Sequence, residues 1–503
     1  MVGYFIECPV LYTGLFMSDT LLDSQIWDKK YFDGAWKTAP KTIPVREPAT
    51  GESLGTAGGG TPELAVQLTE QAAKAQPAWA AKSAEERARI MREAARIIET
   101  HSKEIMDFNV RETGGVEPKA GYEVAIATGE LYHSAAILIQ PIGEILPPTS
   151  PDRMSMAIRV PVGVVSVITP WNVPLVLAMR SVAPALALGN AVVLKPDHQT
   201  PVTGGYLLAR VFEMAGVPAG VFSVIPGGPD VGEALVTASA VRLVTFTGSS
   251  AVGRRVGELA GKALKKVSLE LGGNSPMIIL DDADLDAAAS CGAWGSFLHQ
   301  GQVCMATSRH IVHKKVAAEY MKKLAEHAAA LPVGDPFRAH VAIGPLISEK
   351  QLARVSGIVD DSVKAGAKIV TGGTHEGLFY KPTVLGGVKV GMRAYDEEIF
   401  GPVAPVTIAE DDDEAVALAN GTGYGLAASV MTGSVDRGMR MARRIKAGMV
   451  HINDQTIGDH PGIPMGGMGA SGNGSRFGST TNLDEFTEWQ WITVSATPAR
   501  YPF

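Results

Sequence analysis

Apolar positions in the first third of the chain recur with a helical period. Thr61 followed by Pro62 is typical of an N-cap with proline at the first helical position. The run 83–86, Ser-Ala-Glu-Glu, is typical of a capping box. Behind this box Ile90, Ala94 and Ile97 recur on one helical face. The pattern therefore predicts two helices in this part of the chain.

From residue 160 onward, short β-branched runs alternate with helical segments. Strands are predicted at 162–168, 191–195, 222–225 and 242–247, and helices between them at 202–215 and 231–237. Alternating strands and helices are typical of a parallel sheet covered by helices on both faces. The fold class is therefore α/β, and this region is predicted to be a nucleotide-binding sheet.

A second α/β region is predicted after Glu270. A strand at 309–313 lies between helices at 282–299 and 315–330, and a further helix is expected at 350–366. The acidic run 410–414 is predicted to be a solvated turn leading into a helix at 415–420, since acids suit a helix N-terminus. The glycine-rich stretch 55–60 lies outside both α/β regions and is predicted to be a turn.

Length and composition indicate an ordinary globular protein of several domains. A chain of 503 residues exceeds the size at which one core keeps growing, so about two or three domains are expected. The net charge of -7 provides no basic surface, so no nucleic-acid partner is expected. The three cysteines, Cys8, Cys291 and Cys304, argue against a disulfide framework and for a reducing compartment. A cytoplasmic location is therefore expected.

No membrane partner is expected. The most apolar stretch, 173–194, is interrupted by Arg180, Pro174 and Pro184 and is typical of buried core. Residues 1–16 are apolar but lack the basic segment and the cleavage site of a secretory signal. We expect them to be an extension outside the core, with a membrane-contacting tail as the alternative.

Three separate motifs carry side chains suited to thioester chemistry. Cys304 ends the run 301–304, Glu270 lies in the apolar run 267–274, and Asn172 lies within 169–174. A thiol, a carboxylate and an amide donor are the groups needed to form, hold and hydrolyse a thioester. Each alone is also typical of a structural residue, since a lone cysteine is more often part of the core. Their joint occurrence indicates catalysis.

These motifs resemble the aldehyde dehydrogenase superfamily. The runs 169–174, 270–274, 301–304, 398–402 and 466–472 follow in the family's order and spacing, and the resemblance extends from about Trp27 onward. The runs 177–184 and 297–305 resemble its benzaldehyde dehydrogenase branch.

The resemblance implies three structural parts. These are a Rossmann-type cofactor domain at 17–142 and 160–270, an α/β catalytic domain at 271–472, and a strand-rich oligomerisation flap at 143–159 and 485–503. It also implies a homodimer or a homotetramer.

The resemblance assigns a role to each motif. Cys304 would be the nucleophile, Glu270 the base, and Asn172 a donor to the oxyanion. The cofactor, NAD or NADP, would be held by Thr169, Pro170, Trp171, Lys195, His198, Gly228, Gly248, Ser249, Leu271, Glu398 and Phe400.

Two segments of the expected cofactor site have their own sequence signals. The segment 246–253 has the pattern of a strand end, a glycine turn and a helix N-terminus, which suits a pyrophosphate, although an ordinary capped turn has the same pattern. His198 stands where the family often has a glutamate that grips the ribose, so NADP is not excluded by charge.

The expected reaction is oxidation of an aldehyde, aromatic in kind, to the carboxylate. The expected substrate pocket comprises Leu177, Arg180, Val303, Met305, Ile457 and the loop 457–462. Arg180 and Ser181 replace a tryptophan-lysine pair common in the family, which would widen the pocket for a flat ring. A structural ion pair is the alternative role for Arg180.

Other functions remain open at this point. Aliphatic or betaine-type aldehydes are possible substrates, and a coenzyme A-acylating relative is a second alternative, although such relatives generally lack the base. A non-enzymatic nucleotide-binding protein is disfavoured because all three catalytic motifs are present. No metal site is expected, since the 11 histidines form no H-E-x-x-H pattern.

Overall fold

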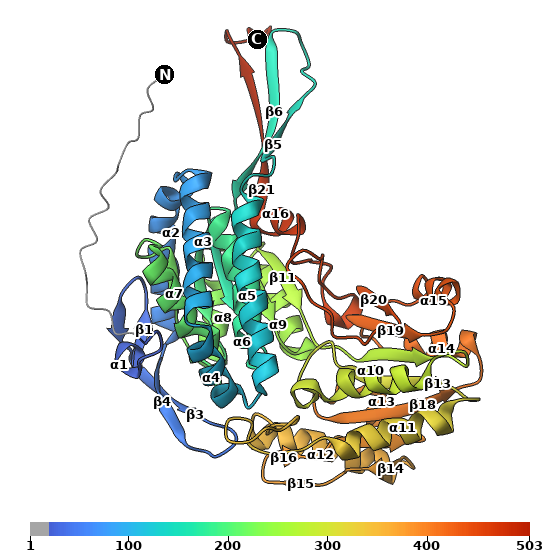
Figure 1. The fold of residues 1–503 in the computed structure, drawn as a ribbon. Helices are drawn as coiled ribbons and strands as arrows, with labels where there is room; N and C mark the ends of the chain where they lie inside the picture. The colour runs from blue at the N-terminus through green and yellow to red at the C-terminus, as the bar shows by residue number, and fades with distance from the viewer. Residues whose placement is uncertain (1–19) are drawn as a thin grey trace, which may run out of the picture.

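The computed structural model describes residues 20–503, so the expected extension 1–16 lies outside the described residues. Within this range two seven-stranded sheets, each covered by helices, form the body of the molecule, and a narrow three-stranded sheet projects from it (Figure 1). The prediction of an α/β fold is confirmed.

The first large sheet has the strand order β11-β10-β7-β8-β9-β1-β2. Its parallel strands are β7 (Val164–Ile168), β8 (Ala191–Lys195), β9 (Phe222–Val224), β10 (Val241–Thr247) and β11 (Lys266–Glu270), and the edge is completed by antiparallel β1 (Lys30–Phe32) and β2 (Trp36–Thr38). Every residue of β7 and β8 is buried, as expected for a parallel sheet covered on both faces. All four predicted strands are confirmed.

Helices cover this sheet on both faces. They are α1 (Ser24–Trp27), α2 (Pro62–Ala80), α3 (Ala84–Thr100), α4 (Ser102–Thr113), α5 (Glu117–Ile137), α6 (Pro174–Ala187), η1 (Val202–Tyr206), α7 (Leu207–Ala215), α8 (Pro229–Thr237) and α9 (Ser250–Lys262). The capping box forms as predicted, because Ser83 and Glu86 each accept a hydrogen bond from the other's backbone N–H. The predicted helix 202–215 begins with one π-helical segment, η1.

The second large sheet has the strand order β14-β17-β18-β13-β12-β19-β20. The strands are β12 (Ser275–Ile279), β13 (Thr307–His313), β14 (Lys368–Thr371), β17 (Thr383–Gly386), β18 (Val403–Ala409), β19 (Ala427–Met431) and β20 (Met449–Ile452). Its helices are α10 (Leu285–Phe297), η2 (Leu298–Gly301), α11 (Ala317–Ala330), α12 (Glu349–Lys364), α13 (Arg393–Asp396), α14 (Asp412–Ala419) and α15 (Val435–Ala442). A small hairpin pairs β15 (His375–Glu376) with β16 (Phe379–Tyr380).

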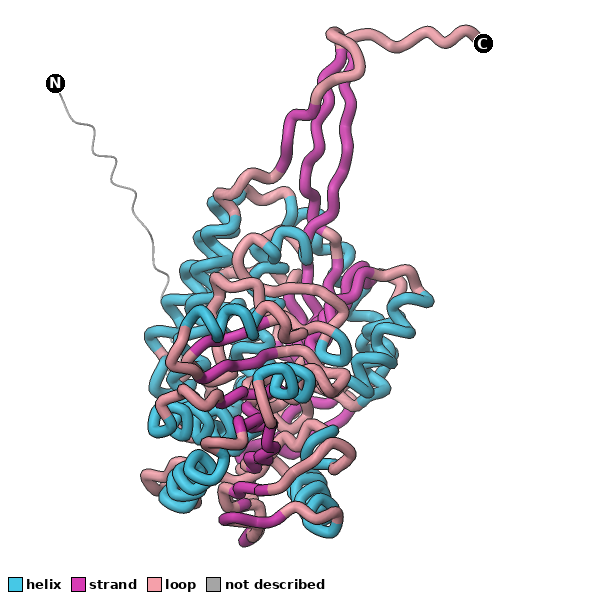
Figure 2. Tube along the Cα trace, turned by 90° about the vertical axis from the view of Figure 1, so that its right-hand side faces the viewer, coloured by secondary structure: helices cyan, strands magenta, loops and turns pink. Residues whose placement is uncertain are grey.

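The projecting sheet joins two distant parts of the chain. It has the order β21-β6-β5, with β5 (Gly143–Leu146), β6 (Arg153–Pro161) and β21 (Thr487–Ser495), and η3 (Gly469–Ser471) and α16 (Thr481–Phe486) precede β21. Figure 2 shows this sheet standing well clear of the body. Its exposed side chains include Ile145, Trp489 and Trp491.

The prediction of a turn at 55–60 is wrong. Residues 55–59 belong to β4 (Ser53–Gly59), which pairs with β3 (Lys41–Arg46) in an antiparallel ribbon. Glycine is required at two of these positions because neighbouring atoms leave no room for a side chain. A Cβ on Gly58 would lie 2.4 Å from the carbonyl oxygen of Lys30, and one on Gly55 would lie 2.3 Å from the Trp27 ring.

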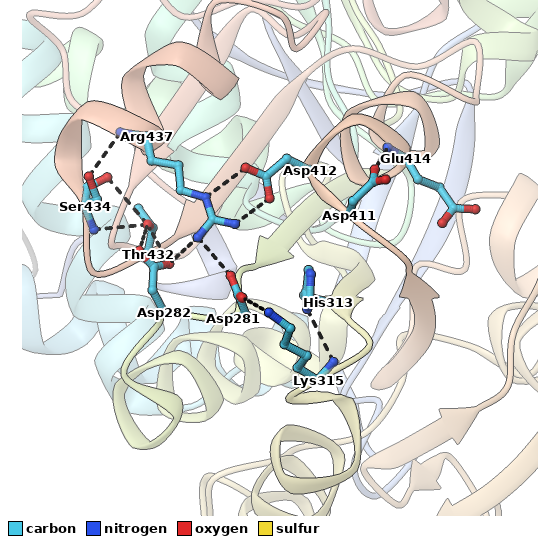
Figure 3. Close-up of polar contacts among 10 residues, drawn as sticks. All are labelled: Asp281, Asp282, His313, Lys315, Asp411, Asp412, Glu414, Thr432, Ser434 and Arg437. Carbon is cyan, nitrogen blue, oxygen red and sulfur yellow. Dashed lines mark hydrogen bonds and ion pairs between the residues drawn. The ribbon is translucent and has the colours of Figure 1, made fainter.

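The prediction of a solvated turn at 410–414 leading into a helix is confirmed in part. Residues 410 and 411 form an exposed bend and the acids lie at a helix N-terminus as expected, but helix α14 begins at Asp412 rather than at 415. Asp411 caps it by accepting a hydrogen bond from the N–H of Glu414. Asp412 accepts two hydrogen bonds from Arg437 of α15, and the same guanidinium donates to Asp281 after β12 (Figure 3). The acidic run therefore helps to tie two helices to the end of the second sheet.

The apolar stretch 173–194 forms α6 and β8, which are buried, so its prediction as core is confirmed. Between residues 20 and 503 we find no helix with the length and apolarity needed to cross a bilayer.

Candidate active site

Two cavities meet at Cys304. The larger, of about 420 Å³, is lined by Pro170, Trp171, Asn172, Leu177, Thr247, Gly248, Ser249, Ser250, Ala251, Leu271, Gly272, Cys304, Gln351, Arg354, Glu398, Phe400 and Tyr424. The narrower is lined by Lys119, Tyr122, Asn172, Val173, Val176, Leu177, Arg180, Leu298, His299, Val303, Cys304, Met305, Ile457, Asp459 and Met465. Because Cys304, Asn172 and Leu177 line both, the thiol lies where the two spaces join.

The loop before Cys304 has an unusual backbone. His299, Gln300 and Gly301 have φ values of 50°, 57° and 66°, three consecutive left-handed residues. Gln300 Nε2 donates hydrogen bonds to the carbonyls of Gly114 and Pro345, both at 2.8 Å. A Cβ on Gly301 would lie 2.2 Å from the carbonyl oxygen of Gly401. Contacts from distant segments thus hold a conformation that is costly by itself, which is typical of functional sites.

The charges around Cys304 disfavour its thiolate. Burial, with the carboxylates of Glu398 and Glu270, raises the pKa of Cys304 to about 12, while Arg180 and the N–H of Met305 act in the opposite direction. The thiol is therefore protonated at neutral pH in this state. It needs a nearby proton acceptor before it can act as a nucleophile.

Glu270 is placed at the carboxyl end of β11. Its side chain is buried, and neither carboxylate oxygen makes a hydrogen bond of normal geometry to a described residue. Burial raises its pKa to about 8, opposed mainly by Arg180 and Arg476. A carboxyl group that titrates near neutral pH is suited to accept and return protons.

Asn172 is oriented by the loop that carries Cys304. Its Nδ2 donates a hydrogen bond of 2.9 Å to the carbonyl of Gln302, and the side chain is buried. The amide has a second hydrogen, and Asn172 lines both cavities beside the thiol. It can therefore supply a donor to an oxygen that develops charge next to Cys304.

The larger cavity contains the N-terminus of α9. Ser249 is the N-cap, and its hydroxyl accepts a hydrogen bond from the N–H of Val252 at 3.4 Å. The strand, glycine turn and helix predicted for 246–253 are confirmed. Free N–H groups at a helix N-terminus attract anions, so this wall suits a pyrophosphate.

The opposite wall is formed by residues after α13. Glu398 accepts a hydrogen bond from the N–H of Gly273 at 2.9 Å, and burial raises its pKa to about 7. Phe400 has a φ of 57°, and its ring contacts Trp171 edge to face with centroids 5.4 Å apart. Glu398, Phe400 and Trp171 thus provide a carboxylate and two aromatic rings close to the thiol.

Four predicted cofactor residues lie outside the walls of this cavity. Thr169 is buried, and Lys195, which ends β8, is buried against Gly232 of α8. Gly228 is the N-cap of α8. The His198 side chain is 61% exposed, with Nδ1 3.4 Å from the Asp197 carboxylate. These residues lie at or after the carboxyl ends of β7, β8 and β9 and line neither cavity.

All five predicted pocket residues lie in the walls of the narrower cavity, as does Asp459 of the predicted loop 457–462. Seven further residues were missed: Lys119, Tyr122, Val173, Val176, Leu298, His299 and Met465. Leu298 and His299 lie inside the motif 297–305, so proximity to Cys304 could have indicated them. Lys119 and Tyr122 come from α5, and nothing in the local sequence marks them.

Arg180 is an ion-pair partner that also lines the narrower cavity. Its side chain is 4% exposed, forms an ion pair with Asp459, and has Nε 3.8 Å from Glu130 Oε1. Tyr122 donates a hydrogen bond to the Asp459 carbonyl at 3.2 Å. The ion-pair alternative for Arg180 is confirmed, and the pair fixes the loop 457–462 against α5 and α6.

Arg180→Met is expected to destabilise the protein by about 3 kcal/mol, because two buried carboxylates lose their counter-charge. Thermal unfolding of Arg180→Met, with Arg180→Lys as the charge-preserving control, measures the effect. An unchanged unfolding temperature in Arg180→Met would contradict this role.

Comparison with known proteins agrees with this geometry. Residues 36–492 match the aldehyde dehydrogenase family. A vanillin dehydrogenase from Amycolatopsis sp. is 51% identical over 486 residues, which cover 96% of this chain and 100% of the relative. A benzaldehyde dehydrogenase [NAD(+)] from Pseudomonas putida is 50% identical over 482 residues, which cover 96% and 99%.

Solved structures of aldehyde dehydrogenases are also similar to this chain. A salicylaldehyde dehydrogenase from Pseudomonas putida G7, complexed with salicylaldehyde, has a TM-score of 0.91 and 35% identity, covering 95% of this chain and 99% of that chain. A betaine aldehyde dehydrogenase from Staphylococcus aureus, in complex with NAD+, has a TM-score of 0.92 and 31% identity, covering 95% and 97%. The chain belongs to the aldehyde dehydrogenase family.

Proposed function

We propose that this enzyme oxidises aromatic aldehydes to carboxylates with NAD or NADP. The observation that carries the proposal is the position of Cys304, which lies where a cavity with a helix N-terminus joins a narrow, largely apolar one. The relatives named for vanillin, benzaldehyde and salicylaldehyde support an aromatic substrate.

The chemistry follows from the three catalytic side chains. Glu270 takes the thiol proton, and Cys304 Sγ bonds to the aldehyde carbon. The Asn172 amide and the N–H of Cys304 donate to the resulting oxyanion. When bound, the nicotinamide cofactor supplies the hydride acceptor. Glu270 releases the first proton to solvent and then accepts a proton from the water that hydrolyses the thioester, with Cys304 leaving as thiolate.

The larger cavity fits such a cofactor. A Cβ on Gly272 would lie 2.3 Å from the Glu398 carboxylate, so glycine is needed to leave that carboxylate its place. Glu398 and Phe400 would hold the nicotinamide ribose and ring, with Pro170, Trp171 and Leu271 beside them. Gly248 and Ser249 would hold the pyrophosphate, and Thr169, Lys195, His198 and Gly228 the adenosine half.

The narrower cavity would hold the aldehyde's ring. Its free space is only about 50 Å³, less than an aromatic ring needs, so the walls must move apart on binding. Leu177, Val303 and Ile457 are apolar walls, and Met305 and Met465 have the flexible side chains that adapt most easily. We therefore infer that the ring lies between these residues, with its aldehyde carbon at Cys304.

The same proposal includes the domain boundaries and the assembly. We infer a cofactor domain at 17–142 and 160–270, of which 17–19 lie outside the described residues, a catalytic domain at 271–472, and a flap at 143–159 and 485–503. Exposed apolar side chains on the flap, among them Trp491 at 67% exposure, favour a homodimer or homotetramer. A cytoplasmic location is supported by the few cysteines.

Steady-state kcat/KM values for benzaldehyde and a linear aldehyde, each with NAD and NADP, test the function. We expect benzaldehyde to be favoured by about tenfold or more, a difference of about 1.4 kcal/mol. Addition of coenzyme A should leave rate and product unchanged. Preference for the linear aldehyde would contradict the aromatic assignment, and an acyl-coenzyme A product would identify an acylating enzyme.

His198→Glu is expected to lower kcat/KM with NADP several-fold and to spare NAD. Two unit charges about 4 Å apart interact by roughly 4 kcal/mol at an effective dielectric of about 20. The exposure of His198 screens this repulsion, yet about a quarter of it still gives a several-fold change. The native enzyme should therefore accept NADP detectably.

His198→Gln is the matched control, because glutamine has the size of glutamate without its charge. The kcat/KM values with NAD and with NADP are measured in the native enzyme, in His198→Glu and in His198→Gln, and the ratio of the two values is compared. A native enzyme inactive with NADP, or an unchanged ratio in His198→Glu, would show that another part of the ribose site sets the choice.

A further inference from the structure

One histidine in the wall of the narrower cavity lacks a well-formed hydrogen bond. His299 is 1% exposed, and neither ring nitrogen makes a hydrogen bond of normal geometry to a described residue, although the backbone of Asn172 lies close enough to act on its pKa. It belongs to η2, five positions before Cys304, and lines the same cavity as the thiol. Buried polar groups are nearly always hydrogen-bonded, so this imidazole requires an explanation.

Another buried histidine shows how the fold satisfies such a ring. His310 of β13 is 0% exposed, with Nε2 2.7 Å from Ser296 Oγ and Nδ1 2.7 Å from the Tyr320 hydroxyl. His310 therefore has a protein partner on each nitrogen. His299, at the cavity beside Cys304, has no partner of normal geometry on either nitrogen, which points to a partner that arrives with the ligand.

The other polar groups of the cavity wall already have partners. Lys119 Nζ forms an ion pair with Glu123 and lies 3.2 Å from both Asn109 Oδ1 and Thr113 Oγ1. The Arg180 ion pair and the hydrogen bond from Tyr122 to Asp459 occupy the far side. Apart from the thiol and the Asn172 amide, which face the reacting carbonyl, His299 is thus a wall side chain available to a new polar group within the described residues.

His299 is neutral under ordinary conditions. Burial, followed by the charge of Lys119, holds its pKa well below the usual range, and only the backbone of Asn172 acts in the opposite direction. A neutral imidazole donates from one nitrogen and accepts at the other. Its natural partner is a neutral group that also donates and accepts, such as a hydroxyl.

We propose that His299 hydrogen-bonds a hydroxyl group on the aromatic ring of the substrate, which makes the enzyme selective for ring-hydroxylated aromatic aldehydes. This inference rests on the proposed function. Apolar side chains, including Val176, Leu177 and Val303, would pack against the ring itself. A methyl group in the same place would fill the space but leave the imidazole unpaired, and sites built to bind a hydroxyl discriminate against analogues that lack it.

The test compares hydroxyl and methyl substituents of similar size. The kcat/KM values are measured for benzaldehyde and for its 2-, 3- and 4-hydroxy and 2-, 3- and 4-methyl derivatives. For at least one ring position, the native enzyme should favour hydroxyl over methyl by about tenfold or more. His299→Phe keeps a flat ring without nitrogens and should lose this preference, read as the ratio of hydroxyl to methyl kcat/KM values within the variant.

Two further variants distinguish the loss of a hydrogen bond from a folding defect in His299→Phe. His299→Asn restores a donor and an acceptor and tolerates the positive φ, so it should retain part of the hydroxyl preference. His299→Ala removes the ring and should lose the preference as His299→Phe does. Cofactor titration and thermal unfolding identify which variants are folded.

A hydroxyl-to-methyl ratio that is the same in native enzyme, His299→Phe and His299→Ala would overturn the proposal. So would a native enzyme that favours methyl over hydroxyl at every position. A native enzyme that oxidises linear aldehydes but none of these aromatic ones would instead overturn the proposed function, so the two failures are distinguishable.

Discussion

Cys304→Ala is expected to abolish aldehyde oxidation and to leave cofactor binding measurable. The thiol is the atom that bonds to the substrate, and loss of a catalytic nucleophile costs roughly 10⁴-fold or more in kcat. The proposed cofactor contacts lie mainly on α9, Glu398 and Phe400, which the substitution leaves in place. Steady-state turnover and titration of cofactor by fluorescence measure the two properties separately.

Cys291→Ala is the matched control for this experiment. Cys291 is the other free thiol among the described residues, and it lies in α10, outside the walls of both cavities. The control should retain activity close to that of the native enzyme. Turnover by Cys304→Ala near the native rate would remove Cys304 from the mechanism.

Glu270→Gln is expected to stop the reaction after the thioester has formed. Glutamine has nearly the shape of glutamate but cannot accept a proton from the hydrolytic water. The variant should release a burst of about one reduced cofactor per site, followed by slow turnover. Mass spectrometry should find the acyl group on Cys304. Normal turnover without a burst would mean that another residue activates the water.

The raised pKa of Glu270 predicts that the rate of thioester hydrolysis depends on pH. Burial raises the pKa of Glu270 to about 8, and the base works only when ionised. Thioester hydrolysis should therefore rise as pH increases through about 8 and should level off above it. In Glu270→Gln this rise should be absent, and single-turnover hydrolysis measured across the pH range compares the two proteins.

Local sequence signals were sufficient for much of the fold. Strands such as 191–195 and the capping box at Ser83 depend on side-chain periodicity and on contacts within a few residues, so they could be predicted. The error at 55–60 and the late start predicted for the helix after 410 came from the same reliance on local composition. The glycines of 55–60 indicated a turn, but the close approach of Trp27 and the Lys30 backbone is what requires them. The acids of 410–414 indicated a solvated turn along their whole length, but the helix already begins at Asp412, which Arg437 of another helix binds.

The catalytic residues were predictable for a different reason. Thiol, carboxylate and amide each lie in a recognisable run, so the sequence itself determined the family and pointed to Cys304, Glu270 and Asn172. It carried no information on their environment. The raised pKa values of Cys304 and Glu270 result from burial and from charges on other elements.

What only the tertiary structure decided is the shape and polarity of the substrate cavity. Lys119 and Tyr122 reach it from α5, and the ion pair between Arg180 and Asp459 joins segments that are far apart in the sequence. The absence of a described partner of normal geometry for His299 likewise depends on every element packed around it. The sequence determined which chemistry the chain carries, because bond-making groups are properties of single residues. The fold decided which substrate that chemistry meets, because a cavity is a property of many distant residues at once.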